Sequence, residues 1–194
     1  MSNHDSVVRL MLVDDKLEDA EHSISQLRNG GIAVRPSRPE TLKELESALA
    51  NQGSDVILAA YTARSLPFSE VMQAAVASGK DVTVVALLDQ VDEASVLAVL
   101  AAGARNFALR GRAEHLQTVI RREARIGERR RQVRRLEAAL RETERRCDAL
   151  IASSRDPIAY VHEGMHIRAN QAYLEIFGYE SFEEIEGLPL LDMV

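Results

Sequence analysis

The sequence has 194 residues, of which 46% are hydrophobic, and a formal net charge of −6 at pH 7. That length suits one full domain and part of another, and the hydrophobic fraction is sufficient for a buried core. No run approaches the roughly 20 apolar residues of a membrane span, the polar start does not resemble a signal peptide, and the single cysteine excludes an internal disulfide, so we expect a cytoplasmic protein.

Short apolar runs alternate with amphipathic segments over residues 1–112. This alternation predicts the α/β class, with a parallel sheet covered by helices on both faces. Three runs are almost continuously apolar, as in strands buried on both faces, whereas two are short and one of these contains Pro36. The expected fold is a doubly wound (βα)5 sheet. The predicted strands are residues 8–13, 33–37, 55–61, 82–88 and 106–109.

Turn and capping residues between these strands mark four helices. A glycine pair at 30–31 ends the first helix, and Thr41 opens the second through a capping box. Pro67 begins the third, and Asp92 or Glu93 begins the fourth. A helix therefore follows each of the first four strands.

A single long helix is predicted from Glu114 onward, with apolar residues at intervals of seven and a second set offset by three. A helix of 40 residues would extend about 60 Å, which favours a coiled coil over a helix packed only on its own domain. Arg122 and Arg129 occupy d positions and Gly127 interrupts the pattern, so we expect the seam to be tightest from Val133 onward. The predicted dimer seam comprises Val119, Ile126, Val133, Leu136, Leu140, Cys147 and Leu150.

The charge is distributed unevenly, because residues 113–150 carry a net charge of +4 and the remainder carries −10. Arg and Glu interleave along the predicted helix, which favours a solvated, ion-paired face over an anionic partner. We therefore expect no nucleic-acid partner.

In a parallel sheet the ligand site lies at the carboxyl ends of the strands. The residues at these ends are Asp14 and Asp15 after the first strand, Ala60 at the third, Leu88 at the fourth and Arg110 after the fifth. Two adjacent carboxylates can hold a hard cation such as Mg²⁺, and they can also cap the helix that follows, where negative charge is favourable. Both roles remain open for the acidic pair.

Three segments resemble the receiver domain of bacterial response regulators, namely residues 10–15, 54–60 and 101–110. The resemblance covers about the first 112 residues. In that family the acidic pair binds Mg²⁺, and an aspartate at the end of the third strand accepts the phosphoryl group. A Ser or Thr at the end of the fourth strand contacts this group, and a Lys on the fifth strand holds it.

The resemblance places Ala60 at the position of the phosphoacceptor aspartate, Leu88 at the hydroxyl position and Arg110 at the Lys position. A methyl group has no lone pair with which to attack phosphorus. We therefore expect a degenerate receiver that cannot be phosphorylated. The chain is expected to contain no catalytic residue, and the acidic pair is expected to be a vestigial metal site.

Residues 154–194 resemble the beginning of a PAS domain, with two short strands, a helix over 170–179 and a capping box at Ser181. The segment is too short for the closed PAS sheet, and we expect no haem, flavin or other cofactor in it. The predicted domains are a degenerate receiver over 1–112, a helical linker or coiled coil over 113–153 and a PAS fragment over 154–194.

This order of domains resembles the FimX-like group of bacterial signalling proteins, in which a receiver and a PAS domain precede degenerate GGDEF and EAL domains. The resemblance implies a protein that is located at a cell pole, senses cyclic di-GMP and regulates type IV pili and twitching motility. We expect this chain to be a non-enzymatic regulatory module that forms a homodimer and contacts protein partners of a signalling or pilus-assembly system, without membrane insertion. The open alternatives are part of an active GGDEF/EAL enzyme, part of a sensor kinase, and an atypical response regulator with another acceptor.

Overall fold

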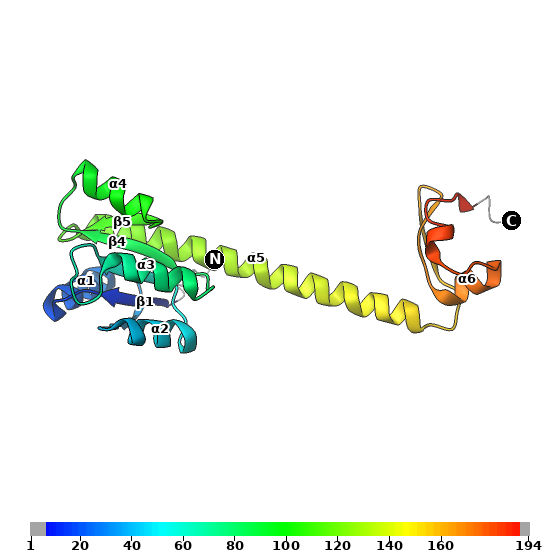
Figure 1. The fold of residues 1–194 in the computed structure, drawn as a ribbon, viewed down its shortest axis with the longest axis horizontal. Coiled ribbons are helices and arrows are strands. Elements are labelled where there is room, and N and C mark those ends of the chain that lie inside the picture. Colours follow the sequence, from blue (N-terminus) through cyan, green and yellow to red (C-terminus); the bar gives the residue numbers. More distant parts are fainter. Residues whose placement is uncertain (1–6, 191–194) are drawn as a thin grey trace. The chain divides into compact units, whose positions relative to one another are not determined.

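The computed structural model describes residues 7–190 (Figure 1). The chain folds into two compact units that divide between Gln132 and Val133, inside one long helix, α5 (Ala113–Ser153). The predicted end of the first domain, residue 112, lies between the last strand of the sheet, which ends at Leu109, and the start of α5. The division lies later in the chain because the first part of α5 packs on the sheet of the first unit.

Five parallel strands form the sheet of the first unit, in the order β2-β1-β3-β4-β5. All five predicted strands are present. Strands β3 and β4 are buried along their whole length, as their continuous apolar sequences predict, and β2 lies at the edge, where Pro36 is tolerated. The strands are β1 (Val8–Val13), β2 (Val34–Ser37), β3 (Val56–Ala60), β4 (Thr83–Leu88) and β5 (Asn106–Leu109).

A helix follows each strand, which confirms the (βα)5 order. Two predicted caps form, because Thr41 Oγ1 accepts a hydrogen bond from the Glu44 amide and Asp92 Oδ1 accepts one from the Ser95 amide. No helix in the described part of the chain combines the length and the apolar character needed to cross a bilayer. The first four helices are α1 (Leu17–Asn29), α2 (Leu42–Asn51), α3 (Phe68–Ala77) and α4 (Glu93–Ala101).

Two apolar layers hold the helices on opposite faces of the sheet. Neighbouring strand residues alternate between the layers: Met11 and Ile57 face one, and Leu10 and Leu58 face the other. Helices α2, α3 and α4 cover the first layer, and α1 and α5 cover the second. The first unit therefore closes both faces of its sheet with its own helices.

The first turns of α5 belong to this core rather than to a coiled coil. Leu116, Val119 and Ile120 are buried against the sheet, and Val119 is only 5% exposed. The prediction that Val119 lies in a dimer seam is therefore wrong. Apolar residues at intervals of seven are found in a coiled-coil seam and also on a helix face that packs on its own domain.

Ion pairs fasten α5 to the amino-terminal ends of the strands. Asp55 is buried and accepts a hydrogen bond from Arg9 Nη2 at 2.7 Å. Arg131 Nη1 lies 2.9 Å from the same carboxylate, without the alignment of a hydrogen bond. Arg130 Nη2 lies 3.2 Å from Asp81 Oδ1. These contacts extend the attachment of α5 to the end of the first unit.

The second unit contains the remainder of α5, a β-hairpin and a short helix. The two predicted strands, the predicted helix and the capping box at Ser181 are all present. The hairpin strands pair antiparallel with an irregularity between Tyr160 and Val161. The elements after α5 are β6 (Ala159–His162), β7 (Met165–Ala169), α6 (Gln171–Phe177) and the 3-10 helix η1 (Phe182–Glu184).

Asn170 connects the end of α5 to this hairpin and helix. Its side chain is buried and donates through Nδ2 to the carbonyl oxygens of Ile151 at 3.2 Å and Asp156 at 2.8 Å. Its Oδ1 accepts from the amides of Ile158 at 2.9 Å and Tyr173 at 3.0 Å. One amide side chain therefore satisfies main-chain groups of three segments of the second unit.

Candidate functional site

The predicted acceptor and hydroxyl positions are part of the apolar core. Ala60 ends β3, is 3% exposed and lies in register with Leu87 of β4. Leu88 ends β4, is 2% exposed and belongs to the layer under α3 and α4. Neither side chain has a polar atom, so neither can donate an electron pair to phosphorus or a hydrogen bond to a phosphoryl oxygen.

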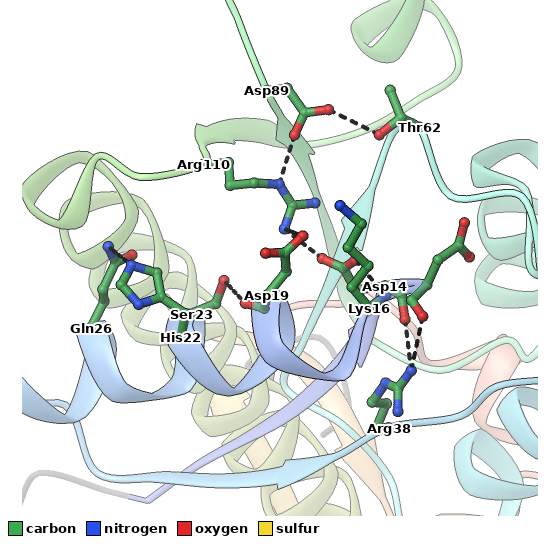
Figure 2. A network of polar contacts seen from close by, with 11 residues as sticks. Asp14, Lys16, Asp19, His22, Ser23, Gln26, Arg38, Thr62, Asp89 and Arg110 are labelled. Carbon is green, nitrogen blue, oxygen red and sulfur yellow. Dashed lines mark hydrogen bonds and ion pairs between the residues drawn. The ribbon is translucent and has the colours of Figure 1, made fainter.

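Arg110 lies at the centre of a polar network at the carboxyl ends of the strands (Figure 2). Its Nη1 donates to Asp14 Oδ2 at 2.7 Å and lies 3.5 Å from Asp19 Oδ2 on α1. Its Nε donates to Asp89 Oδ1 at 2.6 Å, and Thr62 Oγ1 donates to the other oxygen of Asp89 at 3.0 Å. The guanidinium thus connects the residue after β1, the first turn of α1 and the residue after β4, and Asp89 extends the network to the segment after β3.

The hydrogen bonds of this network favour the charged forms of Asp89 and Arg110. The hydrogen bond from Arg110 lowers the pKa of Asp89 below its usual value, and the Thr62 hydroxyl contributes in the same direction. Burial lowers the pKa of Arg110, but its hydrogen bonds to Asp14 and Asp89 outweigh this effect and raise it above the usual value. Both shifts favour the charged forms, so the site holds a fixed cation beside an ionised Asp89 near neutral pH.

Asp15 has a different role from its neighbour Asp14. It accepts hydrogen bonds from the amides of Arg64 at 2.8 Å and Ser65 at 3.1 Å, and from the Ser65 hydroxyl at 2.5 Å. The Ser65 hydroxyl is the main reason that the pKa of Asp15 lies below its usual value. Neither acidic residue caps α1, because the N-cap is Lys16, which makes no side-chain cap. Asp15 instead fixes the loop between β3 and α3.

The acidic pair does not fit a Mg²⁺ site as it stands. Asp14 Oδ2 is bonded to Arg110, whereas Asp15 is bonded to loop amides, so the two carboxylates do not converge on one point. Within residues 7–190, no group of three or more His, Cys, Asp or Glu side chains is arranged to hold a metal ion. The Arg110 guanidinium supplies the positive charge that a hard cation would supply to such carboxylates.

Sequence reasoning missed three members of the network, namely Asp89, Thr62 and Asp19. Asp89 comes directly after β4, Thr62 lies two residues after the end of β3, and Asp19 lies in the first turn of α1. Arg38 was also missed, although its Nη2 donates to the Asp14 carbonyl oxygen at 3.1 Å. Polar residues just beyond each strand end were the available signal, because this is where the ligand edge of a parallel sheet lies.

The remaining candidate residues are those of the predicted seam, and most of them are exposed. Val133, Leu136, Leu140 and Leu150 are between 53% and 71% exposed, and Cys147 is an exposed free cysteine. Ile126 is half-buried at the surface of the first unit. From Val133 onward, α5 therefore presents apolar side chains without a covering layer among the described residues.

Comparisons with known proteins identify the fold of the first unit. No family model matches the sequence, and no curated protein matches it. The signal receiver domain of the response regulator NarL from Mycobacterium tuberculosis is 19% identical, with a TM-score of 0.54, over 62% of this chain and 98% of that domain. A CheY-like response regulator receiver protein from Methanospirillum hungatei is 17% identical, with a TM-score of 0.53, over 64% of this chain and 99% of its own.

A third solved structure is a fusion of the trimeric coiled coil of yeast Spc42 to another protein. It is 18% identical, with a TM-score of 0.57, over 75% of this chain and 97% of its own. Identities this low establish the fold and nothing further. The first unit has the fold of a response-regulator receiver domain, with a five-stranded parallel sheet between two layers of helices, and a 41-residue helix continues from it.

Proposed function

We propose that this chain is a receiver-like signalling module that works without phosphorylation and without enzymatic activity. The observation that carries the proposal is the Arg110 guanidinium, held between Asp14 and Asp89 at the sheet edge where Ala60 occupies the acceptor position. Phosphoryl transfer needs a nucleophile in line with the phosphorus and a cation that neutralises its oxygens. This edge offers a methyl group and a cation that is already engaged.

Homodimerisation through α5 is the second part of the proposal. The exposed Val133, Leu136, Leu140 and Leu150 recur at a and d positions of a heptad. Most of the stability of a helix in a protein comes from packing of its apolar face, and burial of apolar surface stabilises by about 25 cal/mol per Å². A second helix packed against this seam would cover these apolar side chains and would also stabilise α5.

The third part of the proposal concerns the whole protein. We propose that the module regulates a FimX-like cyclic-di-GMP effector that controls type IV pili and twitching motility. Its partners would be proteins of that signalling or pilus-assembly system, at a cytoplasmic and polar location. The support is the sequence resemblance described above, together with the hairpin-and-helix order of the second unit, which is compatible with the start of a PAS domain.

Phosphorylation chemistry tests the proposal directly. The chain is incubated with Mg²⁺ and either acetyl phosphate or beryllofluoride, and its intact mass and amide NMR spectrum are recorded. We expect both to stay unchanged. The matched variant carries Ala60→Asp, Leu88→Thr and Arg110→Lys, which together restore a nucleophile, a hydroxyl and a compact ammonium, and we expect it to respond to beryllofluoride. A stoichiometric phospho-adduct on the unaltered chain would overturn the proposal in favour of an atypical response regulator.

A further inference from the structure

The arginines of α5 within the first unit fall into two groups. One group is attached to the domain: Arg121 donates to the Gly30 carbonyl oxygen at 2.7 Å, and Arg130 and Arg131 pair with aspartates of the strand ends. The members of the second group are exposed, and their side chains make no hydrogen bond or ion pair with any described residue. This second group comprises Arg122, Arg125 and Arg129.

The unpaired arginines line a shallow groove on the surface of α5, which we call the arginine groove. Their spacing of three and then four residues places them on one face of the helix. Ile126 is half-buried between them and provides an apolar contact. No acidic side chain lines this surface. The arginine groove consists of Thr118, Arg121, Arg122, Arg125, Ile126 and Arg129.

The unpaired arginines of the arginine groove lack the intrahelical carboxylate partners that two arginines further along the helix have. Further along α5, Arg141 pairs with Glu137 and Arg146 pairs with Glu142 across one turn. Like charges one turn apart destabilise a helix by about 0.2–0.5 kcal/mol per pair. Three unpaired guanidinium groups therefore form a surface that an anionic partner would stabilise.

A second copy of α5 does not fit the arginine groove. Arg122 and Arg129 occupy d positions of the heptad, so a seam continued through this segment would place arginine against arginine. Guanidinium groups cannot lose their charge near neutral pH, and their repulsion is stronger at a partly dry interface than in water. A coiled coil is therefore expected to end near Val133, which leaves the groove available to another partner.

Nucleic acid and membranes fit the groove less well than a protein does. Outside residues 113–150 the chain carries a net charge of −10, which repels an extended polyanion. An anionic membrane favours helices whose large apolar side chains protrude beside the basic ones, whereas Ile126 is half-buried. A short acidic segment avoids both difficulties, because it needs to contact only the groove.

We propose that the arginine groove binds an acidic α-helix of a partner protein. Carboxylates three and four residues apart on that helix would pair with Arg122, Arg125 and Arg129, and an apolar residue between them would contact Ile126. The inference rests on the proposed role of the chain as a protein-interaction module and names the chemistry of the partner. Binding at the groove does not involve Arg110 or the strand ends.

The test uses the full chain and a fluorescein-labelled synthetic helix with Glu at positions i, i+3 and i+7 and Leu at i+4. Fluorescence anisotropy compares the unaltered chain with a groove variant that carries Glu at positions 122, 125 and 129. The matched control carries Glu at the exposed positions 141, 145 and 146 of the same helix, so that the net charge changes equally. Circular dichroism verifies that all three proteins are equally helical.

We expect the groove variant to bind at least about tenfold more weakly, which corresponds to about 1.4 kcal/mol, and the control variant to bind within about threefold of the unaltered chain. If both variants bound the acidic helix equally weakly, or if a scrambled peptide bound the unaltered chain as tightly as the acidic helix does, the binding would be explained by general electrostatic attraction. Either result would overturn the proposal. Tighter, groove-dependent binding of duplex DNA or of anionic vesicles would also overturn it. A phospho-adduct, in contrast, would overturn the proposed function and leave the peptide result unaffected.

Discussion

Arg110 gives the ligand edge of this receiver fold a permanent positive charge. A bound Mg²⁺ would contribute its charge through exchangeable oxygen ligands, whereas the guanidinium is covalently attached to the chain and reaches Asp14 and Asp89 directly. The planar group donates in two directions at once, which a Lys ammonium at the same position could not reproduce with the same geometry. The Arg110 contacts therefore favour one fixed arrangement of the strand ends.

The first prediction concerns Arg110→Ala. This change leaves the Asp14 carboxylate, whose side chain is 5% exposed, without its cation. We expect a loss of about 2–3 kcal/mol in the free energy of unfolding measured in urea. Millimolar Mg²⁺ should raise the thermal midpoint of the variant, because a cation can then bind the released carboxylates, but not that of the unaltered chain.

Arg112→Ala serves as the control for this experiment, because Arg112 is exposed and only its main chain makes hydrogen bonds. It should unfold like the unaltered chain with and without Mg²⁺. A thermal midpoint of the unaltered chain that rises with Mg²⁺ would show that the acidic pair still binds the ion despite Arg110.

The second prediction concerns the titration of Asp55. Burial raises the pKa of this carboxyl, but the hydrogen bonds from Arg9 outweigh that effect, with a further contribution from the charge of Arg131, and the pKa lies below its usual value. Such a group stabilises the fold above its unfolded pKa of about 3.9, and this contribution disappears as the pH falls through the lower folded pKa. Acid should therefore weaken the attachment of α5.

We expect Asp55→Asn to lose about 2–3 kcal/mol at pH 7, because two arginines lose their charged partner. Its stability should then fall less steeply than that of the unaltered chain below about pH 4. Urea unfolding over this pH range measures both effects. Glu46→Gln, at an exposed position of α2, is the control. Identical pH profiles for the two variants would show that Asp55 does not govern acid stability.

At the scale of elements, α5 has a different environment in each unit. Up to Gln132 it is the fifth helix of the receiver fold, and its own residues Leu116 and Ile120 are buried against the sheet. After Val133 its apolar residues are exposed, and intrahelical pairs such as Glu137 with Arg141 are among its stabilising contacts. The exposed portion is therefore where an additional helix contributes most to stability.

The third prediction tests the seam with Leu140→Lys, a substitution at an a position that is 60% exposed. A lysine there would bury a charge between the helices, so light scattering should show a dimer becoming a monomer at micromolar concentration, and helicity should fall. The control is Ala138→Lys, which adds the same charge at an exposed position outside the seam. A monomeric unaltered chain at high micromolar concentration would contradict the seam.

Strands β3 and β4 were predictable because both are buried on both faces, and an apolar run of five or six residues is too short for a buried helix. The assignment of Val119 was not predictable, since a core-facing helix and a coiled-coil seam share the same apolar interval. Ala60 and Arg110 were located by sequence because each ends or follows a strand. The contact of Asp15 with Ser65 was not, because the intervening loop has no periodic pattern.

At the scale of the whole molecule, the division after Gln132 makes a prediction about fragments. A fragment that ends at Gln132 retains both apolar layers and the ion pairs of Arg130 and Arg131. We expect it to fold as a monomer, with dispersed amide NMR signals and cooperative thermal unfolding.

A fragment that ends at residue 112 lacks Leu116, Val119 and Ile120, which cover one face of the sheet. It should remain unfolded or aggregate, because that face would be exposed. Cooperative folding of the shorter fragment would mean that the sheet and four helices suffice, and that the first half of α5 is dispensable.

The positive charge of Arg110 is a permanent part of the chain, and this affects how long a signal from this site could last. A phosphoryl group on a receiver has a lifetime, set by the reactions that add and remove it, and the output of such a domain decays when its input stops. A side chain is added once, by the ribosome, and leaves only when the protein is degraded. Under the proposed function, Arg110 sets no lifetime for the signal, and the strength of the signal would follow the number of copies of the protein in the cell and their binding partners.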